Sequence, residues 1–188
     1  MNKYIVFFFI FGFSFSSFAQ KKKAKIVSKP LLTIAIRGKI TETFSYCGGA
    51  PPPAELLAEL NTPKPACKYT IFFRRDSNDL KKPIFKEMMT DSAGRFELRL
   101  PPGKYVIVDA KKKDLETYQN TISHYKKETN DRGAIDILCY NQFIATPDYV
   151  LIVPKSTKKS YISMEINYFR SCNWSGHPCV EYRGPLPP

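Results

Sequence analysis

The 188-residue sequence predicts an all-β protein, a seven-stranded antiparallel β-sandwich with little helix. Two observations predict this class: apolar and polar residues alternate in several short runs, and glycine and proline mark turns between the runs. A third is that helical spacing occurs in only two short stretches. The expected strands are 31–42, 68–75, 83–90, 95–100, 104–110, 148–153 and 161–170.

The N-terminal segment, MNKYIVFFFIFGFSFSSFAQ, has one lysine, then an apolar stretch, then small residues before Ala19. This layout is typical of a secretory signal peptide. We therefore expect residues 1–19 to be removed, the product to be periplasmic or extracellular, and no transmembrane segment to remain; an uncleaved anchor is the alternative. Residues 20–30 are basic and end in proline, which indicates a disordered leader.

The sandwich is expected to span residues 31–170. In its first strand, Leu32, Ile34, Ile36 and Ile40 share one face, as the period of two in a half-buried strand requires. Gly38 interrupts this inward set, which indicates a bulge or a close backbone approach.

Residues 44–67 break the alternation and are expected to be an inserted loop. Cys47, Gly48 and Gly49 make its start flexible, and prolines stiffen the following stretch. The sequence AELLAEL, 54–60, predicts a short helix that ends at the next prolines. Its leucines are expected to cover a sheet edge or one end of the sandwich.

The stretch TDSAGRFELRLPPGKYVIV, residues 90–108, contains two turn signals and two alternating runs. Gly94 adopts a positive φ at little cost, and the PPG sequence at 101–103 supplies a second turn. The pattern predicts a regular hairpin that serves as scaffold. A second hairpin loop is expected at 76–82.

Two later segments differ from the strands. Residues 111–131 carry apolar side chains at helical spacing within a charged stretch, which predicts a surface helix. The sequence AIDILCY, 134–140, is expected to form a short strand or a packed loop.

Three motifs then occur in order, RGKI at 37–40, TDSAGRF at 90–96 and LPPGKY at 100–105. Together they resemble the carboxypeptidase regulatory-like family over residues 31–110. The resemblance implies a Greek-key sandwich of the transthyretin or prealbumin type, used as an accessory, spacer or binding domain. With the phenylalanine-rich leader, the chain resembles exported proteins of Bacteroidota-like bacteria.

The five cysteines are disulfide candidates, because exported proteins meet an oxidising environment; they are Cys47, Cys67, Cys139, Cys172 and Cys179. One scheme pairs Cys172 with Cys179 and Cys47 with Cys67. A competing scheme ties the tail to the body, with Cys47 or Cys139 bonded to Cys172 or Cys179. Both schemes predict that the Cys- and Pro-rich tail, 171–188, is stapled and packs on the sandwich.

An alternative assigns Cys172, His177 and Cys179 to a metal site, although their spacing is not one of the strong zinc patterns. Catalysis has few candidate groups, because the chain has two histidines and no nucleophile motif. The YRG at 182–184 is similar to the tail of hydroxyisourate hydrolases, but those enzymes use several histidines on inner strands. We expect no enzymatic activity and no cofactor.

The net charge of +12 comes from scattered lysine clusters without an aromatic and arginine platform, so nucleic acid is not expected as a partner. These clusters are interpreted as solvated loop charges or, alternatively, as a source of long-range attraction to an anionic cell surface or an acidic polysaccharide.

The sequence thus predicts an exported, non-enzymatic module that binds an envelope protein or an anionic polysaccharide. The expected contact surface combines the insert with the tail, through Cys47, Gly48, Gly49, Trp174 and His177. The alternatives are a metal-binding or catalytic envelope protein that uses the Cys172, His177 and Cys179 cluster, and a purely structural envelope component.

Overall fold

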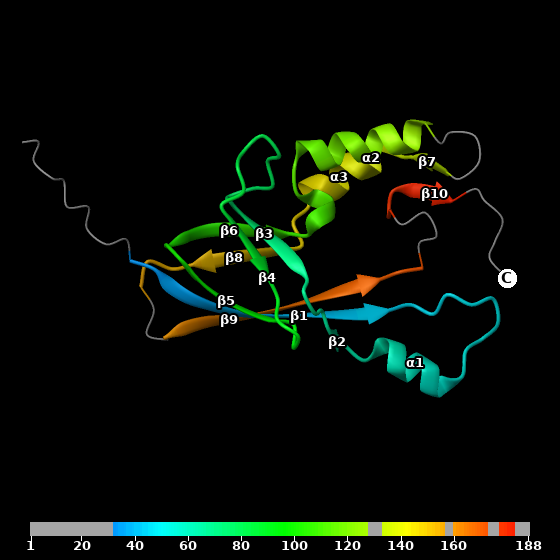
Figure 1. Cartoon of the computed structure of the whole chain (residues 1–188), viewed down its shortest axis with the longest axis horizontal. Coiled ribbons are helices and arrows are strands. Elements are labelled where there is room, and N and C mark those ends of the chain that lie inside the picture. Colours follow the sequence, from blue (N-terminus) through cyan, green and yellow to red (C-terminus); the bar gives the residue numbers. More distant parts are fainter. Residues whose placement is uncertain (1–31, 128–132, 157–159, 173–176, 183–188) are drawn as a thin grey trace, which may run out of the picture. The chain divides into compact units, whose positions relative to one another are not determined.

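The computed structural model describes residues 32–127, 133–156, 160–172 and 177–182. The expected signal peptide, 1–19, and leader, 20–30, lie outside these residues. Within the described part, ten strands form three sheets and are accompanied by three α-helices and one 3-10 helix (Figure 1). The predominance of strands is confirmed, but the strands number ten rather than seven. A search of the described residues finds no helix long and apolar enough to cross a membrane.

The first sheet is built around β1 (Ile34–Phe44). Along one edge, the first half of β1 pairs antiparallel with β5 (Arg95–Leu100), and its second half with the two-residue β2 (Lys64–Pro65). Gly38 lies opposite Phe96, and a Cβ at Gly38 would stand 2.0 Å from the Phe96 ring. The expected close approach is therefore confirmed, because the ring occupies the space of the missing side chain.

The other edge of β1 carries β9 (Tyr161–Arg170), and this pair is parallel along its whole length. The expectation of a purely antiparallel sandwich was therefore wrong. The reason is the path of the chain, which leaves the second sheet after β8 and enters the first sheet at the end where β1 begins. Ala35 consequently lies beside Tyr161, and Phe44 beside Arg170.

The second sheet has four strands in the order β4 (Lys86–Met89), β3 (Thr70–Arg75), β6 (Gly103–Val108) and β8 (Tyr149–Val153). All three of its strand pairs are antiparallel. The hairpin between β3 and β4 confirms the loop expected at 76–82.

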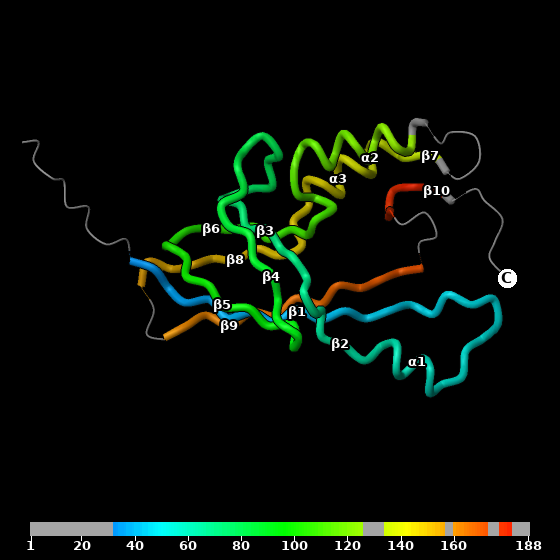
Figure 2. The backbone as a smooth tube through the Cα atoms, in the orientation of Figure 1, coloured from blue at the N-terminus to red at the C-terminus, as the bar shows by residue number. Residues whose placement is uncertain are grey.

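The hairpin expected over residues 90–108 is not formed. β5 pairs with β1 in the first sheet, whereas β6 pairs with β3 and β8 in the second, so the PPG turn carries the chain from one sheet to the other (Figure 2). The two runs bury their apolar faces against a shared core from opposite sides, and this arrangement replaces edge-to-edge pairing. The Tyr105 hydroxyl secures the arch by donating to the Pro101 carbonyl oxygen at 2.8 Å. Gly94, in the preceding turn, has the expected positive φ of 72°.

One apolar cluster joins the two four-stranded sheets. Its fully buried members come from both sheets: Ile36, Ile40 and Leu100 from the first, and Ile71, Phe73, Tyr105 and Ile107 from the second. Burying a side chain of this size contributes about 1.5–3 kcal/mol. Leu32 does not join the cluster, since it precedes the strand and is 62% exposed.

The insert contains the predicted helix, α1 (Ala54–Asn61), but this helix has no buried residue. The expectation that its leucines cover a sheet edge was therefore wrong. Leu56 and Leu57 remain 36% and 40% exposed.

A second group of elements follows β6, and we call it the helical layer: η1 (Ala110–Lys112), α2 (Leu115–Lys127), β7 (Gly133–Ile135), α3 (Ile137–Ala145) and β10 (Val180–Tyr182). α2 confirms the helix expected within 111–131. α3 was missed, because its short apolar sequence is also compatible with a strand. Its start is specified locally, since the Asp136 carboxylate accepts the N–H groups of Leu138 and Cys139.

Arg74 connects the helical layer to the outer face of the second sheet. Arg74 is 1% exposed, and its guanidinium donates to the carbonyl oxygens of Asp79, Lys82 and Lys113. Asn78 adds an amide bond to the Ile144 carbonyl oxygen at 2.7 Å. These contacts fix η1 and α3 against the sheet, and this position creates the cavity described next.

Candidate functional site

The candidate site is a cavity of about 290 Å³ where the end of β9 meets the helical layer. We call it the Asp109 cavity. Its lining comes from the end of β6 and η1 (Asp109, Lys111), α3 (Phe143), the residue before β8 (Asp148), the end of β9 (Tyr168, Phe169, Arg170) and the tail (Ser171, Pro178).

Asp109 is buried in the wall of this cavity, with 7% of its surface exposed. Its Oδ1 accepts the backbone N–H of Lys111 at 2.9 Å, which begins η1. Its Oδ2 receives the Tyr69 hydroxyl at the long distance of 3.4 Å. Burial, and then the negative charge of Asp148, raise the pKa of Asp109.

Asp148 is the second carboxylate of the wall, and three donors hold it. Its Oδ1 accepts Lys112 Nζ at 2.5 Å, and its Oδ2 accepts the Asp109 backbone N–H at 2.8 Å and the Tyr168 hydroxyl at 3.1 Å. Lys112 also donates to the Thr146 carbonyl oxygen at 2.8 Å. Asp148 thus ties η1, β8 and β9 together.

The wall of the cavity next to β9 also contains aromatic rings and a second ion pair. The rings of Tyr69 and Tyr168 are 5.0 Å apart, and the Arg170 guanidinium lies over both. Arg170 Nε donates to Glu42 Oε1 at 2.7 Å. Burial is the main cause that raises the pKa of both tyrosine hydroxyls, so they stay protonated and act as donors. Phe169 is 63% exposed and lines the cavity.

The cysteines follow the competing scheme, with bonds Cys47–Cys172 and Cys139–Cys179, while Cys67 is a free, exposed thiol. The pairings of Cys47 with Cys67 and of Cys172 with Cys179 were therefore wrong. The parallel register explains the first bond: β1 and β9 end side by side at Phe44 and Arg170, so the cysteines that follow lie 5.4 Å apart between Cα atoms. The Ser45 N–H donates to the Arg170 carbonyl oxygen at this junction.

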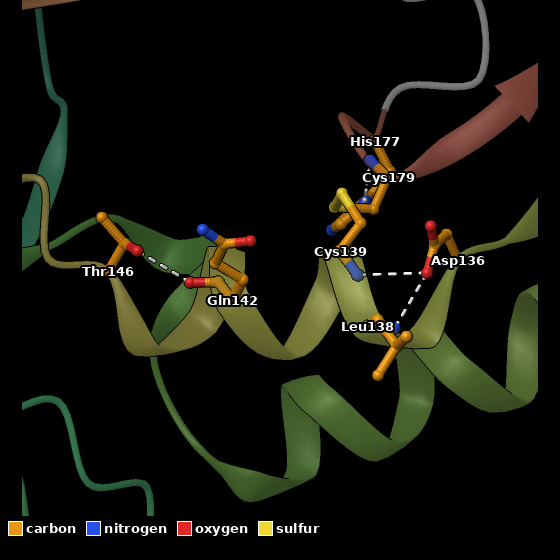
Figure 3. The surroundings of a disulfide bond; sticks show 7 residues. All are labelled: Asp136, Leu138, Cys139, Gln142, Thr146, His177 and Cys179. Atoms are coloured by element: carbon orange, nitrogen blue, oxygen red, sulfur yellow. Dashed lines mark hydrogen bonds between the residues drawn. A yellow bond between two sulfur atoms is a disulfide. The ribbon is translucent and has the colours of Figure 1, made fainter.

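The second disulfide closes the helical layer by joining α3 to the tail (Figure 3). Both bonds fasten the described tail to the body, as the competing scheme predicted. Two disulfides indicate a non-cytoplasmic, oxidising compartment.

His177 is buried in the helical layer, beside this disulfide, and is 5% exposed. Its ring lies 4.7 Å from the Tyr140 ring and 5.3 Å from the Phe143 ring, and its Nδ1 accepts the Cys179 N–H. Burial, and then the positive charge of Lys111, lower its pKa to about 4, so the imidazole is neutral at pH 7. His177 also lines a cavity of about 420 Å³ together with residues of α2, among them His124, which is exposed.

The metal alternative requires thiolates at Cys172 and Cys179, but both sulfur atoms are in disulfides with different partners. In the part of the chain that the structure describes, no group of three His, Cys, Asp or Glu residues is placed to hold a metal ion.

The expected contact residues are only partly brought together. Cys47 meets the tail through its disulfide, whereas Gly48 and Gly49 are exposed in the insert. His177 belongs to the helical layer, and Trp174 lies outside the described residues.

The Asp109 cavity itself was missed by sequence reasoning. A signal was present, because Asp109 ends one apolar run and Asp148 begins the next. In an antiparallel pair, the end of one strand meets the start of its neighbour, and the Asp148 N–H indeed donates to the Ile107 carbonyl oxygen. The sequence does not show that β6 pairs with β8, and without this pairing Asp109 and Asp148 could not be placed together.

No family model and no curated protein matches the chain. Among solved structures, the Bacillus anthracis TIE protein is similar at a TM-score of 0.27 and 13% identity, over 73% of this chain and 17% of that one. A 9R-lipoxygenase from Cyanothece PCC8801 is similar at a TM-score of 0.29 and 14% identity, over 78% of this chain and 18% of that one. The chain spans less than a fifth of either structure, and scores this low carry no argument about fold or function.

Proposed function

We propose that the protein is an exported, non-enzymatic binding or accessory module of the bacterial cell envelope, which takes its ligand in the Asp109 cavity. The observation that carries this proposal is a cavity with charged and aromatic walls, bordered by a tail that two disulfides fasten to the body. Pockets with a few converging polar groups among apolar ones are the usual form of a ligand site. The resemblance to the carboxypeptidase regulatory-like family supports an accessory role.

The hydrogen bonds of the two cavity carboxylates favour a binding function over a catalytic one. Asp148 already accepts three hydrogen bonds, and Asp109 caps η1, so both hold the cavity walls in place. His177 is neutral and enclosed by aromatic rings. A general base requires an accessible proton acceptor close to the reacting group. Asp148 and His177 are engaged structurally and Asp109 Oδ1 caps η1, which leaves Asp109 Oδ2 as an acceptor for a ligand.

The compartment and the partner follow from charge and disulfides. The basic chain attracts anionic polymers over long distances, so the partner is an anionic polysaccharide of the envelope or an envelope protein. Long-range attraction brings the protein to the anionic surface, and the cavity then contacts an uncharged group of the partner.

Sedimentation of the purified, disulfide-bonded protein with isolated bacterial envelopes tests this proposal. We expect retention to persist in about 0.5 M salt, where the Debye length falls to about 4 Å. Phe169→Ala should weaken retention about tenfold, as expected if the ring is one of the minority of interface residues that cost more than about 1 kcal/mol when truncated. The matched control is Met89→Ala, because Met89 lies on β4 and is 61% exposed against 63% for Phe169. Complete release by salt together with unchanged retention of Phe169→Ala would instead identify a structural component held only by charge.

A further inference from the structure

We propose that the Asp109 cavity binds one neutral pyranose ring of a saccharide, by hydroxyl contacts with its charged wall and by stacking on its exposed aromatic side. This inference rests on the proposed binding function and names its ligand class. It combines three observations on the cavity: its charge balance, its available hydrogen-bonding groups and its size.

The first observation is that the charges at and behind the cavity balance. Three are acidic and three are basic, namely Glu42, Asp109 and Asp148 with Lys111, Lys112 and Arg170. Two buried or half-buried pairs, Lys112 with Asp148 and Arg170 with Glu42, account for four of them. A charged ligand would compete with these pairs, and an unpaired buried charge is costly. A neutral polar ligand leaves the pairs intact.

The second observation concerns hydrogen bonds. Asp109 Oδ2 accepts the Tyr69 hydroxyl at the long distance of 3.4 Å, so this buried oxygen retains acceptor capacity. Arg170 uses Nε and one Nη on Glu42, and a guanidinium has five N–H donors. Acceptors and donors thus lie in the same wall. Hydroxyl groups both donate and accept, and a ring with several hydroxyls matches this mixture.

The third observation concerns shape and size. At about 290 Å³, the cavity is at the lower limit of pockets for drug-sized ligands, which suits a single ring. Phe169 lines the cavity from the end of β9 and is 63% exposed, and Phe143 lines it from α3. Aromatic faces of this kind pack against the C–H groups of a pyranose, while its hydroxyls point to the polar wall.

Amide-resolved NMR titration of the disulfide-bonded protein tests the inference with three probes: methyl β-D-glucopyranoside as the neutral ring, L-alanine as a zwitterion and D-galacturonate as an anionic ring. We expect the neutral glycoside to shift amides of the Asp109 cavity with a Kd of about 1 mM, the affinity that a ligand of about a dozen heavy atoms ordinarily reaches. Cellotetraose, added as a fourth probe, separates a glycan end from a free sugar, because only a ring at a chain end can enter while the other rings remain outside.

Two variants test whether the sugar binds in the Asp109 cavity. Phe169→Ala should weaken binding about tenfold without affecting the fold, since the side chain is largely exposed. Asp109→Asn keeps the size and the capping oxygen but halves the carboxylate acceptors, and should weaken binding to a similar extent. Met89→Ala should bind as the unchanged protein does.

The outcomes separate the two proposals. Shifts of the cavity amides by L-alanine or D-galacturonate, and not by the neutral rings, would overturn the ligand class and leave a binding function in place. No shift of these amides by any probe, together with salt-released sedimentation, would overturn both. Shifts by the glycoside that persist unchanged in both variants would place the sugar elsewhere and refute the assignment to this cavity.

Discussion

The sandwich and the helical layer are held together by different means. Among the described residues, fifteen buried ones form the core between the two large sheets, whereas the buried cluster of the helical layer has three, Tyr140, Ile144 and Cys179. The Cys139–Cys179 disulfide supplies the stability that this small apolar cluster does not provide. A region too small to bury a sizeable core is stabilised by a covalent constraint, and the candidate site forms where these two regions meet.

The largest expected effect is in the sandwich. Phe73→Ala removes a fully buried ring from the shared core and should lower the free energy of unfolding by about 4 kcal/mol. Urea denaturation followed by circular dichroism measures this loss. Met89→Ala, on an exposed edge position, is the control and should change stability by less than about 0.5 kcal/mol. A loss below about 1 kcal/mol for Phe73→Ala would show that the two sheets do not share a tight core.

The next effect is in the helical layer. Replacing Cys139 and Cys179 together by serine opens a cross-link that spans 40 residues and should cost about 3 kcal/mol. The loss should be local, because the sandwich core contains neither cysteine. Hydrogen exchange is the measurement: amides of α2, α3, β7 and β10 should lose protection while β1 and β3 keep theirs. Cys67→Ser, at an exposed free thiol, is the matched control. Equal loss of protection in both regions would contradict their independence.

The smallest of the three effects depends on pH. His177 has a folded pKa lowered to about 4, below its unfolded value, so its stabilising contribution is fully present above about pH 6.5 and is lost as the pH falls toward 4. The expected loss is about 2 kcal/mol, confined to the helical layer. Hydrogen exchange at pH 7 and pH 4.5 measures it, and His177→Gln removes the titrating group. An unchanged pH dependence in His177→Gln would assign the effect to other groups.

Much of the sandwich could be predicted from the sequence. The alternation in 95–100 and 161–170 matches β5 and β9 residue for residue, because a strand with one buried face must repeat every two positions. α1 and α2 were also expected from helical spacing. The short stretch at 134–140 was ambiguous, and the helix α3 was decided there by the Asp136 cap and by burial of Tyr140.

The candidate site could not be predicted in the same way. Asp109 follows β6, Asp148 precedes β8, and Tyr168 and Arg170 lie on β9. Nothing in their local sequence states which of these strands are neighbours. The insert and tail were the expected contact surface because they are rich in glycine, proline and cysteine, yet Gly48 and Gly49 are exposed and His177 lies in an aromatic cluster.

Local periodicity and residue chemistry were sufficient to predict the seven longer strands, the turns between them and the availability of cysteines for cross-links, but not β2, β10 or α3. Only the tertiary structure decided that β5 and β6 lie in opposite sheets, that β9 runs parallel to β1, and therefore which cysteines meet and where Asp109 faces Asp148. The physical reason is that strand partners are chosen by burying apolar faces across the whole chain, a global condition that no single segment contains.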